Sequence, residues 1–109
     1  MTVNELAKSL ELKPVAMPDG DREINGAYIG DLLSWVMGRA QSGNVWITIM
    51  SNINIVAVAS LTDVACIVLA EGVTLEDNVR VTAEQKGVNI FTSGKTAYEL
   101  AADLASLSK

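Results

Sequence analysis

The stretch from Asn44 to Gly72, NVWITIMSNINIVAVASLTDVACIVLAEG, decides the fold of this chain. Its two apolar runs, Val45–Met50 and Ala65–Leu69, have the composition typical of strands buried on both faces of a sheet. The segment between them, residues 51–64, is long enough for the crossover that joins parallel strands. Its β-branched residues would also suit a strand, but Asn52 near its start can cap a helix. We therefore predict the order strand, helix, strand.

The segments on either side continue the alternation of helix and strand. Thr2 and Glu5 have the spacing of a capping box, Asp31 and Thr74 are candidate N-caps, and Pro14 favours a sheet edge or a strand start. The predicted helices span residues 3–10, 31–42, 74–86 and 95–107, and the further predicted strands span residues 12–17, 22–29 and 88–91.

From residue 44 onward the predicted order is βαβαβα. This order indicates parallel strands, right-handed crossovers and an α/β three-layer sandwich with a mostly parallel sheet. A chain of 109 residues is enough for one domain with one core. We expect a single domain over residues 1–109, with residues 1–21 forming an N-terminal helix and edge strand and residues 22–109 forming the core.

Charge and hydropathy exclude some classes of partner. The net charge is −5 and the basic residues are scattered, which argues against binding to nucleic acid or to an anionic membrane. The apolar runs are too short for a transmembrane helix, and the polar N-terminus favours a cytoplasmic protein. Because 50% of the residues are hydrophobic, we expect a homodimer; a tightly covered parallel sheet is the alternative explanation.

The sequence offers little catalytic chemistry. It contains no histidine and one cysteine, Cys66, which lies in an apolar run and is expected to be buried. Histidine-dependent catalysis and most zinc sites are thereby excluded. We expect no enzyme activity, no metal and no cofactor.

Polar residues follow the predicted strands, at the sheet edge where α/β proteins bind ligands. Helix N-termini at this edge favour an anion, and neutral hydroxyl and amide groups can add hydrogen bonds. The candidate ligand-binding residues are Asp31, Ser51, Asn52, Asn54, Gly72, Thr92, Ser93, Lys95 and Thr96. For each of them, capping a helix is the alternative role.

Residues 93–96, SGKT, look like the end of a phosphate-binding P-loop. Position 89 is Asn89 where that motif needs glycine, so nucleotide hydrolysis and kinase chemistry are excluded on this basis, and Lys95 is left as a weak phosphate contact. Trp46 falls in a core strand. Trp35 lies beside the apolar stripe of its helix and is either a core residue or an anchor for a partner.

These segments resemble the DRTGG-domain family. The matching pieces are GDLLSWVM (30–37), VWITI (45–49), NIVAVA (54–59), ACIVL (65–69), GVNI (87–90) and TAYEL (96–100). Domains of this family occur alone, beside CBS domains and in some phosphotransacetylases, and they resemble the N-terminal domain of HPr kinase/phosphorylase.

The resemblance implies a regulatory or ligand-sensing module that tends to dimerise, without kinase activity. Our first hypothesis is therefore a non-catalytic regulatory domain that binds a small anionic ligand or nucleotide at the strand ends. The alternative is a dimeric protein-interaction module that docks on a metabolic enzyme or on an HPr-kinase-like signalling partner.

Overall fold

A computed structural model describes residues 1–107 and confirms the α/β class. Within those residues the helices are α1 (Val3–Ser9), α2 (Leu33–Arg39), α3 (Asn54–Thr62), α4 (Asp77–Lys86) and α5 (Ala97–Leu107). The strands are β1 (Lys13–Ala16), β2 (Ala27–Ile29), β3 (Val45–Thr48), β4 (Cys66–Leu69) and β5 (Ile90–Thr92). The βαβαβα order predicted from residue 44 is confirmed, including the helical crossover between β3 and β4.

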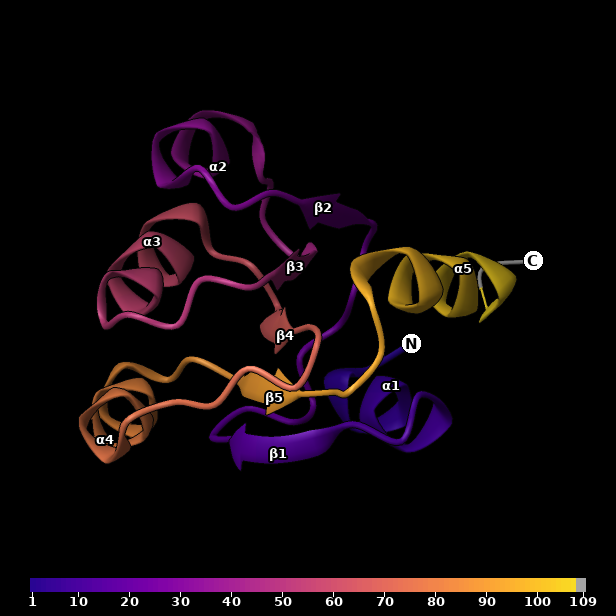
Figure 1. Cartoon of the computed structure of the whole chain (residues 1–109), viewed down its shortest axis with the longest axis horizontal. Coiled ribbons are helices and arrows are strands. Elements are labelled where there is room, and N and C mark those ends of the chain that lie inside the picture. Colours follow the sequence, from indigo (N-terminus) through magenta and orange to yellow (C-terminus); the bar gives the residue numbers. More distant parts are fainter. Residues whose placement is uncertain (108–109) are drawn as a thin grey trace.

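The strands form one mostly parallel sheet with the order β1-β5-β4-β3-β2 (Figure 1). Strands β2 to β5 run parallel to one another, and each pairs with its neighbour in sequence. Strand β1 pairs antiparallel with β5, and Lys13 lies opposite Thr92. The edge position predicted from Pro14 is confirmed, since proline cannot donate a hydrogen bond to a further strand.

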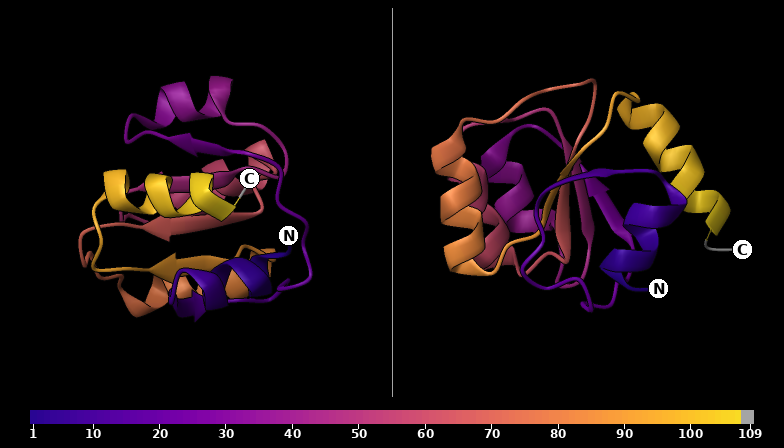
Figure 2. Two further views of the ribbon diagram at one scale, coloured as in Figure 1. Left: turned by 90° about the vertical axis from the view of Figure 1, so that its right-hand side faces the viewer. Right: turned by 90° about the horizontal axis from the view of Figure 1, so that it is seen from below.

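Helices cover both faces of the sheet and make the predicted three layers. Figure 2 shows α2, α3 and α4 on one face and α1 and α5 on the other. Trp46, Ile55 and Val79 belong to the apolar core on the first face, whereas Leu6 and Leu100 belong to the core on the second. Both cores include side chains from β3 and β4, and these two strands are buried throughout.

Local signals explain some helix ends well. Thr2 and Glu5 form the predicted capping box, in which each side chain accepts a hydrogen bond from the backbone of the other. Helix α4 ends at Gly87, which has φ +73° and acts as the predicted left-handed C-cap. In both places the helix end is fixed by residues close to it in sequence: a capping box satisfies free N–H groups, and a glycine adopts the left-handed conformation.

Two predicted N-caps, Asp31 and Thr74, are wrong, and the third, Asn52, lies one residue before the N-cap position but still caps the first helical N–H. Helix α2 begins at Leu33 because the Asp31 carboxylate instead accepts hydrogen bonds from Thr48, the last residue of β3, and from Ile49, which follows it. Helix α4 begins at Asp77, after an extended segment that includes Thr74. Helix α3 has Ile53 as its N-cap, and the Asn52 side chain accepts from the backbone N–H of Asn54.

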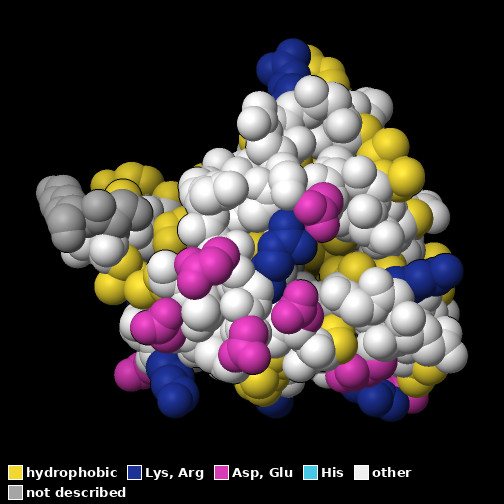
Figure 3. Space-filling view, turned by 180° about the vertical axis from the view of Figure 1, so that it is seen from behind, with side chains coloured by type: hydrophobic (Ala, Val, Ile, Leu, Met, Phe, Trp, Pro, Cys, Tyr) yellow, Lys and Arg dark blue, Asp and Glu magenta, His cyan; other side chains and the backbone are white. Residues whose placement is uncertain are grey.

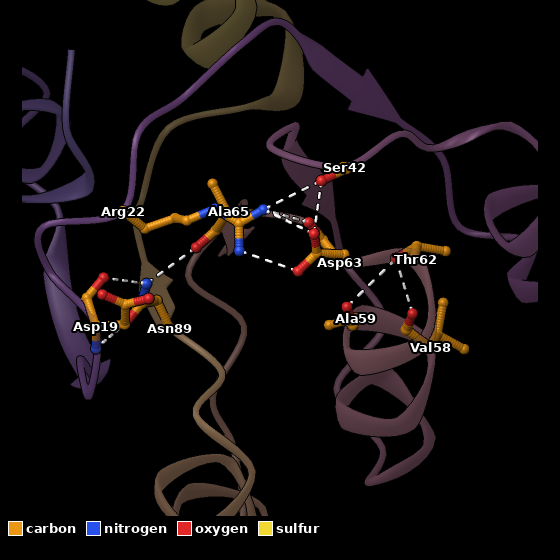
Figure 4. A network of polar contacts seen from close by, with 9 residues as sticks. All are labelled: Asp19, Arg22, Ser42, Val58, Ala59, Thr62, Asp63, Ala65 and Asn89. Atoms are coloured by element: carbon orange, nitrogen blue, oxygen red, sulfur yellow. Dashed lines mark hydrogen bonds and ion pairs between the residues drawn. The ribbon is translucent and has the colours of Figure 1, made fainter.

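The predicted strand over residues 22–29 is shorter, because only Ala27–Ile29 pairs along β3. Glu23 makes an isolated bridge to Thr2. Arg22 extends to the loop between α3 and β4, where it binds Asp63 (Figure 4). These contacts hold the start of the segment away from the sheet.

The predicted inward stripe of α2 is also partly wrong. Val36 is fully buried, but Leu32 and Met37 are 60% and 45% exposed. Trp35 is 53% exposed, and its ring stacks under the Arg39 guanidinium at 3.9 Å. This short helix therefore presents apolar side chains to solvent. Within residues 1–107, no helix is long and apolar enough to cross a membrane.

Candidate functional site

The chain leaves β4 and β5 toward opposite faces of the sheet. The segment after β4 leads to α4 on one face, and the segment after β5 leads to α5 on the other (Figure 1). Backbone hydrogen bonds of 2.8 Å join the two segments, from Gly72 N–H to the Ser93 carbonyl and from Glu71 N–H to the Lys95 carbonyl. In open α/β sheets, ligands bind where neighbouring connections diverge in this way.

A cavity of about 520 Å³ opens beside these two segments, and we call it the crevice. Its volume lies within the range of small-molecule sites, which is about 300–1,000 Å³. It is lined by Glu11, Lys13, Val15, Gly72, Val73, Thr74, Leu75, Glu76, Asp77, Arg80, Thr92, Ser93 and Gly94.

The crevice has apolar and polar parts. Val15, Val73 and Leu75 are partly buried and pack against the hydrophobic core, so they form its apolar floor. The hydroxyl groups of Thr92 and Ser93 lie at the end of β5 and are partly buried. Hydroxyl groups that accept as well as donate suit a ligand with several polar atoms.

Charges of both signs line the crevice. Lys13 comes from β1 and Arg80 from α4, so two cations reach it from different elements. The Asp77 carboxylate accepts a 2.8 Å hydrogen bond from Arg80 Nε, and this contact lowers the pKa of Asp77 below its usual value. Glu11 and Glu76 add two more carboxylates.

A second cavity, of about 570 Å³, adjoins the crevice. The segment 74–76 lines both cavities. Ser51 and Asn52 line the second cavity, beside the start of α3. The segment after β3 therefore lies next to the crevice without forming its wall.

The predicted site residues fall into three groups. Gly72, Thr92 and Ser93 lie together in the crevice, and Ser51 and Asn52 lie in the adjoining cavity. The remaining four, Asp31, Asn54, Lys95 and Thr96, line neither cavity.

Two of these four, Lys95 and Thr96, lie just before α5 and form hydrogen bonds to residues of that helix. Lys95 donates a 2.6 Å hydrogen bond to the Asp103 carboxylate. Thr96 caps α5 by accepting from Glu99 N–H, and the Glu99 carboxylate accepts from Thr96 N–H in return. The segment that resembles a P-loop end thus caps and braces a helix, as the alternative role proposed for its residues requires.

Sequence reasoning missed Lys13, Glu76 and Arg80. Lys13 reaches the crevice only because β1 pairs with β5, and the sequence carries no signal for that pairing. Arg80 was detectable in principle, since it lies three residues after Asp77 on the same side of a predicted helix.

Two further kinds of site, a metal site and a reactive thiol, find no support within the described residues 1–107. Within the described residues, no three Cys, Asp or Glu side chains are grouped so that they could hold a metal ion. Cys66 is buried as predicted, and burial raises the pKa of its thiol to about 12. A thiol with so high a pKa is not a nucleophile at neutral pH.

The fold is similar to that of a solved regulatory protein. No protein-family model and no curated protein sequence matches the chain. A crystal structure of the CBS and DRTGG domains of the regulatory region of Clostridium perfringens pyrophosphatase superposes with a TM-score of 0.69 and 11% identity. The match covers 93% of this chain and 44% of that one, so this chain spans less than half of its length.

The chain is DRTGG-like in fold. The architecture expected from the family resemblance is thereby confirmed. The pyrophosphatase region was crystallised in complex with an activator, diadenosine tetraphosphate. At this identity the similarity concerns the fold alone, so the function of this DRTGG-like chain is argued from its own residues.

Proposed function

We propose that this chain is a non-catalytic regulatory domain that senses a small anionic ligand, such as a nucleotide, in the crevice formed by β1, the segment after β4 and the end of β5. The observation that carries the proposal is the position of the crevice at the diverging connections of a parallel sheet, with two cations on its walls. Similarity in fold to a regulatory region that binds a nucleotide activator is consistent with this role.

The residues of the crevice suit binding more than reaction. Its hydroxyl groups would need a base to act as nucleophiles, and the sequence contains no histidine. Its apolar floor and mixed charges instead provide the few directed polar groups that fix a ligand on an apolar surface. A regulatory role follows if binding alters how the domain contacts another protein.

A thermal-shift screen tests this proposal. A ligand that binds only the folded state stabilises it by RT ln(1 + L/Kd), where L is the free ligand concentration, so the melting temperature rises with that concentration. We expect stabilisation by at least one nucleotide or phosphorylated metabolite and none by the matching nucleoside or unphosphorylated compound. A panel in which every compound leaves the melting temperature unchanged at millimolar concentration would contradict ligand sensing.

A second role, self-association, is favoured by a different surface. A groove of about 380 Å³ runs between α5 and the outer strand β2, and the side chains that line it are uncharged, including Ile24, Ile29 and Leu104. Ile29 is 49% exposed, although a strand residue of this type is usually covered. We propose that a second copy of this chain covers the groove and the open edge of β2 in a two-fold dimer.

Light scattering at micromolar concentration tests the dimer. We expect a mass of two chains for the wild type and of one chain for Ile29→Lys, which places a charge in the groove. The matched control is Val81→Lys, because Val81 is a comparably exposed apolar residue on α4, remote from the groove. A wild-type protein that stays monomeric would remove this role.

A further inference from the structure

Arg80 already has a partner in the crevice, but that partner leaves most of its binding capacity unused. The hydrogen bond from Arg80 to Asp77 uses Nε, at 2.8 Å. A guanidinium group has two further nitrogens, whose fork matches two oxygens of a phosphate or carboxylate. Both side chains of the pair are largely exposed, at 46% for Arg80 and 79% for Asp77, so the pair is weak and can exchange.

Lys13 offers a second cation on another wall of the same cavity. It lies opposite Thr92 in the β1–β5 pairing, which places it at the end of β5 where the hydroxyl groups of the crevice lie. Lys13 and Arg80 belong to different elements, so a ligand held by both would bridge β1 and α4. Such a bridge gives binding a way to fix the position of one element against the other.

The negative charges of the crevice decide what kind of anion it can hold. Glu11, Glu76 and Asp77 oppose Lys13 and Arg80, so the lining as a whole does not attract anions from a distance. Local contacts must therefore supply the affinity for an anion. A phosphate group that replaces Asp77 on Arg80 would form two charge-assisted hydrogen bonds where one existed before.

We propose that Lys13 and Arg80 hold the phosphate of the sensed ligand and that Asp77 competes with this phosphate for Arg80. The inference rests on the function proposed above and assigns its contacts. The apolar floor of Val15, Val73 and Leu75 receives the remainder of the ligand, which is therefore a phosphate ester with a flat or apolar part. Asp77 acts as an internal stand-in that occupies Arg80 until the ligand arrives.

Titrations followed by ¹⁵N NMR test this assignment, with ADP, pyrophosphate and adenosine as separate probes. We expect ADP to shift the amide signals of Gly72, Ser93 and Gly94, and pyrophosphate to bind more weakly at the same place. Adenosine is expected to bind weakest, because it lacks the phosphate. Shifts centred on Asn52 and Asn78 instead would place the ligand in the adjoining cavity and overturn the assignment.

The ADP affinities of single-residue variants test each proposed contact separately. We expect Lys13→Gln and Arg80→Gln each to weaken ADP binding by about tenfold, the usual loss for a hydrogen bond between charged groups. Asp77→Asn should strengthen ADP binding by about two- to fivefold, since an exposed ion pair of this kind is worth only that much. Asp103→Asn is the matched control: it removes the same charge and frees Lys95, and it should leave ADP affinity unchanged.

The outcomes distinguish this inference from the proposed function. If ADP binds the wild type while Lys13→Gln and Arg80→Gln bind it equally well, sensing stands and the assigned contacts are wrong. Strengthening by Asp103→Asn rather than Asp77→Asn would make Lys95 the contact and would also overturn the assignment. If no probe binds either the wild type or Asp77→Asn, the inference fails, and the proposed function fails with it only when the thermal-shift panel also finds no stabilising compound.

Discussion

Arg22 and Asp63, 41 positions apart in sequence, form a two-pronged ion pair in which each terminal guanidinium nitrogen lies 3.0 Å from one carboxylate oxygen. Arg22 also donates to the Asp63 carbonyl at 2.9 Å, and Ser42 donates to the same carboxylate at 2.6 Å (Figure 4). The pair joins the segment before β2 to the loop before β4. It lies at the opposite end of the sheet from the crevice, on the side where Figure 3 shows acidic side chains gathered around a basic one.

Removing Arg22 should weaken the fold and change its response to acid. Hydrogen bonds from Arg22 and Ser42 hold the pKa of Asp63 below its usual value. A lowered carboxyl pKa adds stability above the unfolded pKa of about 3.9, and this contribution is lost as the pH falls through the folded-state pKa. Because Asp63 is largely exposed, we expect Arg22→Gln to cost only about 1 kcal/mol at pH 7.

Urea denaturation at pH 7 and at successively lower pH measures this effect. The difference between wild type and Arg22→Gln should shrink as the pH drops toward 3. Arg39→Gln, which removes an exposed arginine that lies on Trp35, is the control and should show no such convergence. A difference that stays constant down to pH 3 would mean that the pair contributes nothing through ionisation.

The side chain of Asn89 should matter more for stability than any exposed asparagine. It is 2% exposed, and its amide donates to the carbonyls of Asp19 and Ala65 and accepts from Asp19 N–H. Asn89→Ala leaves those backbone groups without partners, at an expected cost of about 2–3 kcal/mol. Asn78→Ala, on the surface of α4, should change the free energy of unfolding by less than about 0.5 kcal/mol. Equal effects of the two would contradict this role.

Two glycine substitutions should act in opposite directions. Gly87 and Gly38 both have open space where a methyl group would be added, but only Gly87 has a positive φ, of +73°. We expect Gly87→Ala to destabilise by about 1 kcal/mol, because a side chain is strained in that conformation. Gly38→Ala, within α2, should stabilise by about 0.5 kcal/mol. Thermal melts of the two variants give the comparison, and the same sign for both would contradict it.

Cys66 should not react while the chain is folded. Its thiol is buried and has a pKa of about 12, so neither thiolate nor access is available at pH 8. We expect a thiol reagent such as DTNB to label it only in denaturant, or at a rate set by unfolding. Rapid labelling in native buffer would show that the strand β4 opens locally.

The sequence was informative wherever neighbouring residues decide the structure. The βαβαβα order followed from apolar runs at suitable spacing, and the capping box of Thr2 with Glu5 and the stop at Gly87 followed from local chemistry. The starts of α2 and α4 were predicted wrongly, and for α2 the reason is a partner distant in sequence. The Asp31 carboxylate accepts hydrogen bonds from Thr48 at the end of β3 and from Ile49 directly after it, so it does not cap α2.

The candidate site shows the same division. Gly72, Thr92 and Ser93 could be placed at one edge because parallel strands bring their carboxyl ends together. Lys13 could not, since its place depends on an antiparallel pairing between the first strand and the last. The predictions of Lys95 and Thr96 as ligand contacts gain no support, because both side chains already brace α5.

That pairing of β1 with β5 has a consequence for how the molecule acquires its shape. Strands β2 to β5 each join a neighbour adjacent in sequence, so they can assemble stepwise by closing short loops. Strand β1 can pair only once β5 has been made, and Asp19 must likewise wait for Asn89. During translation β1 therefore emerges well before its partner and docks only after β5 has formed, and the wall of the crevice that carries Lys13 is completed in that step.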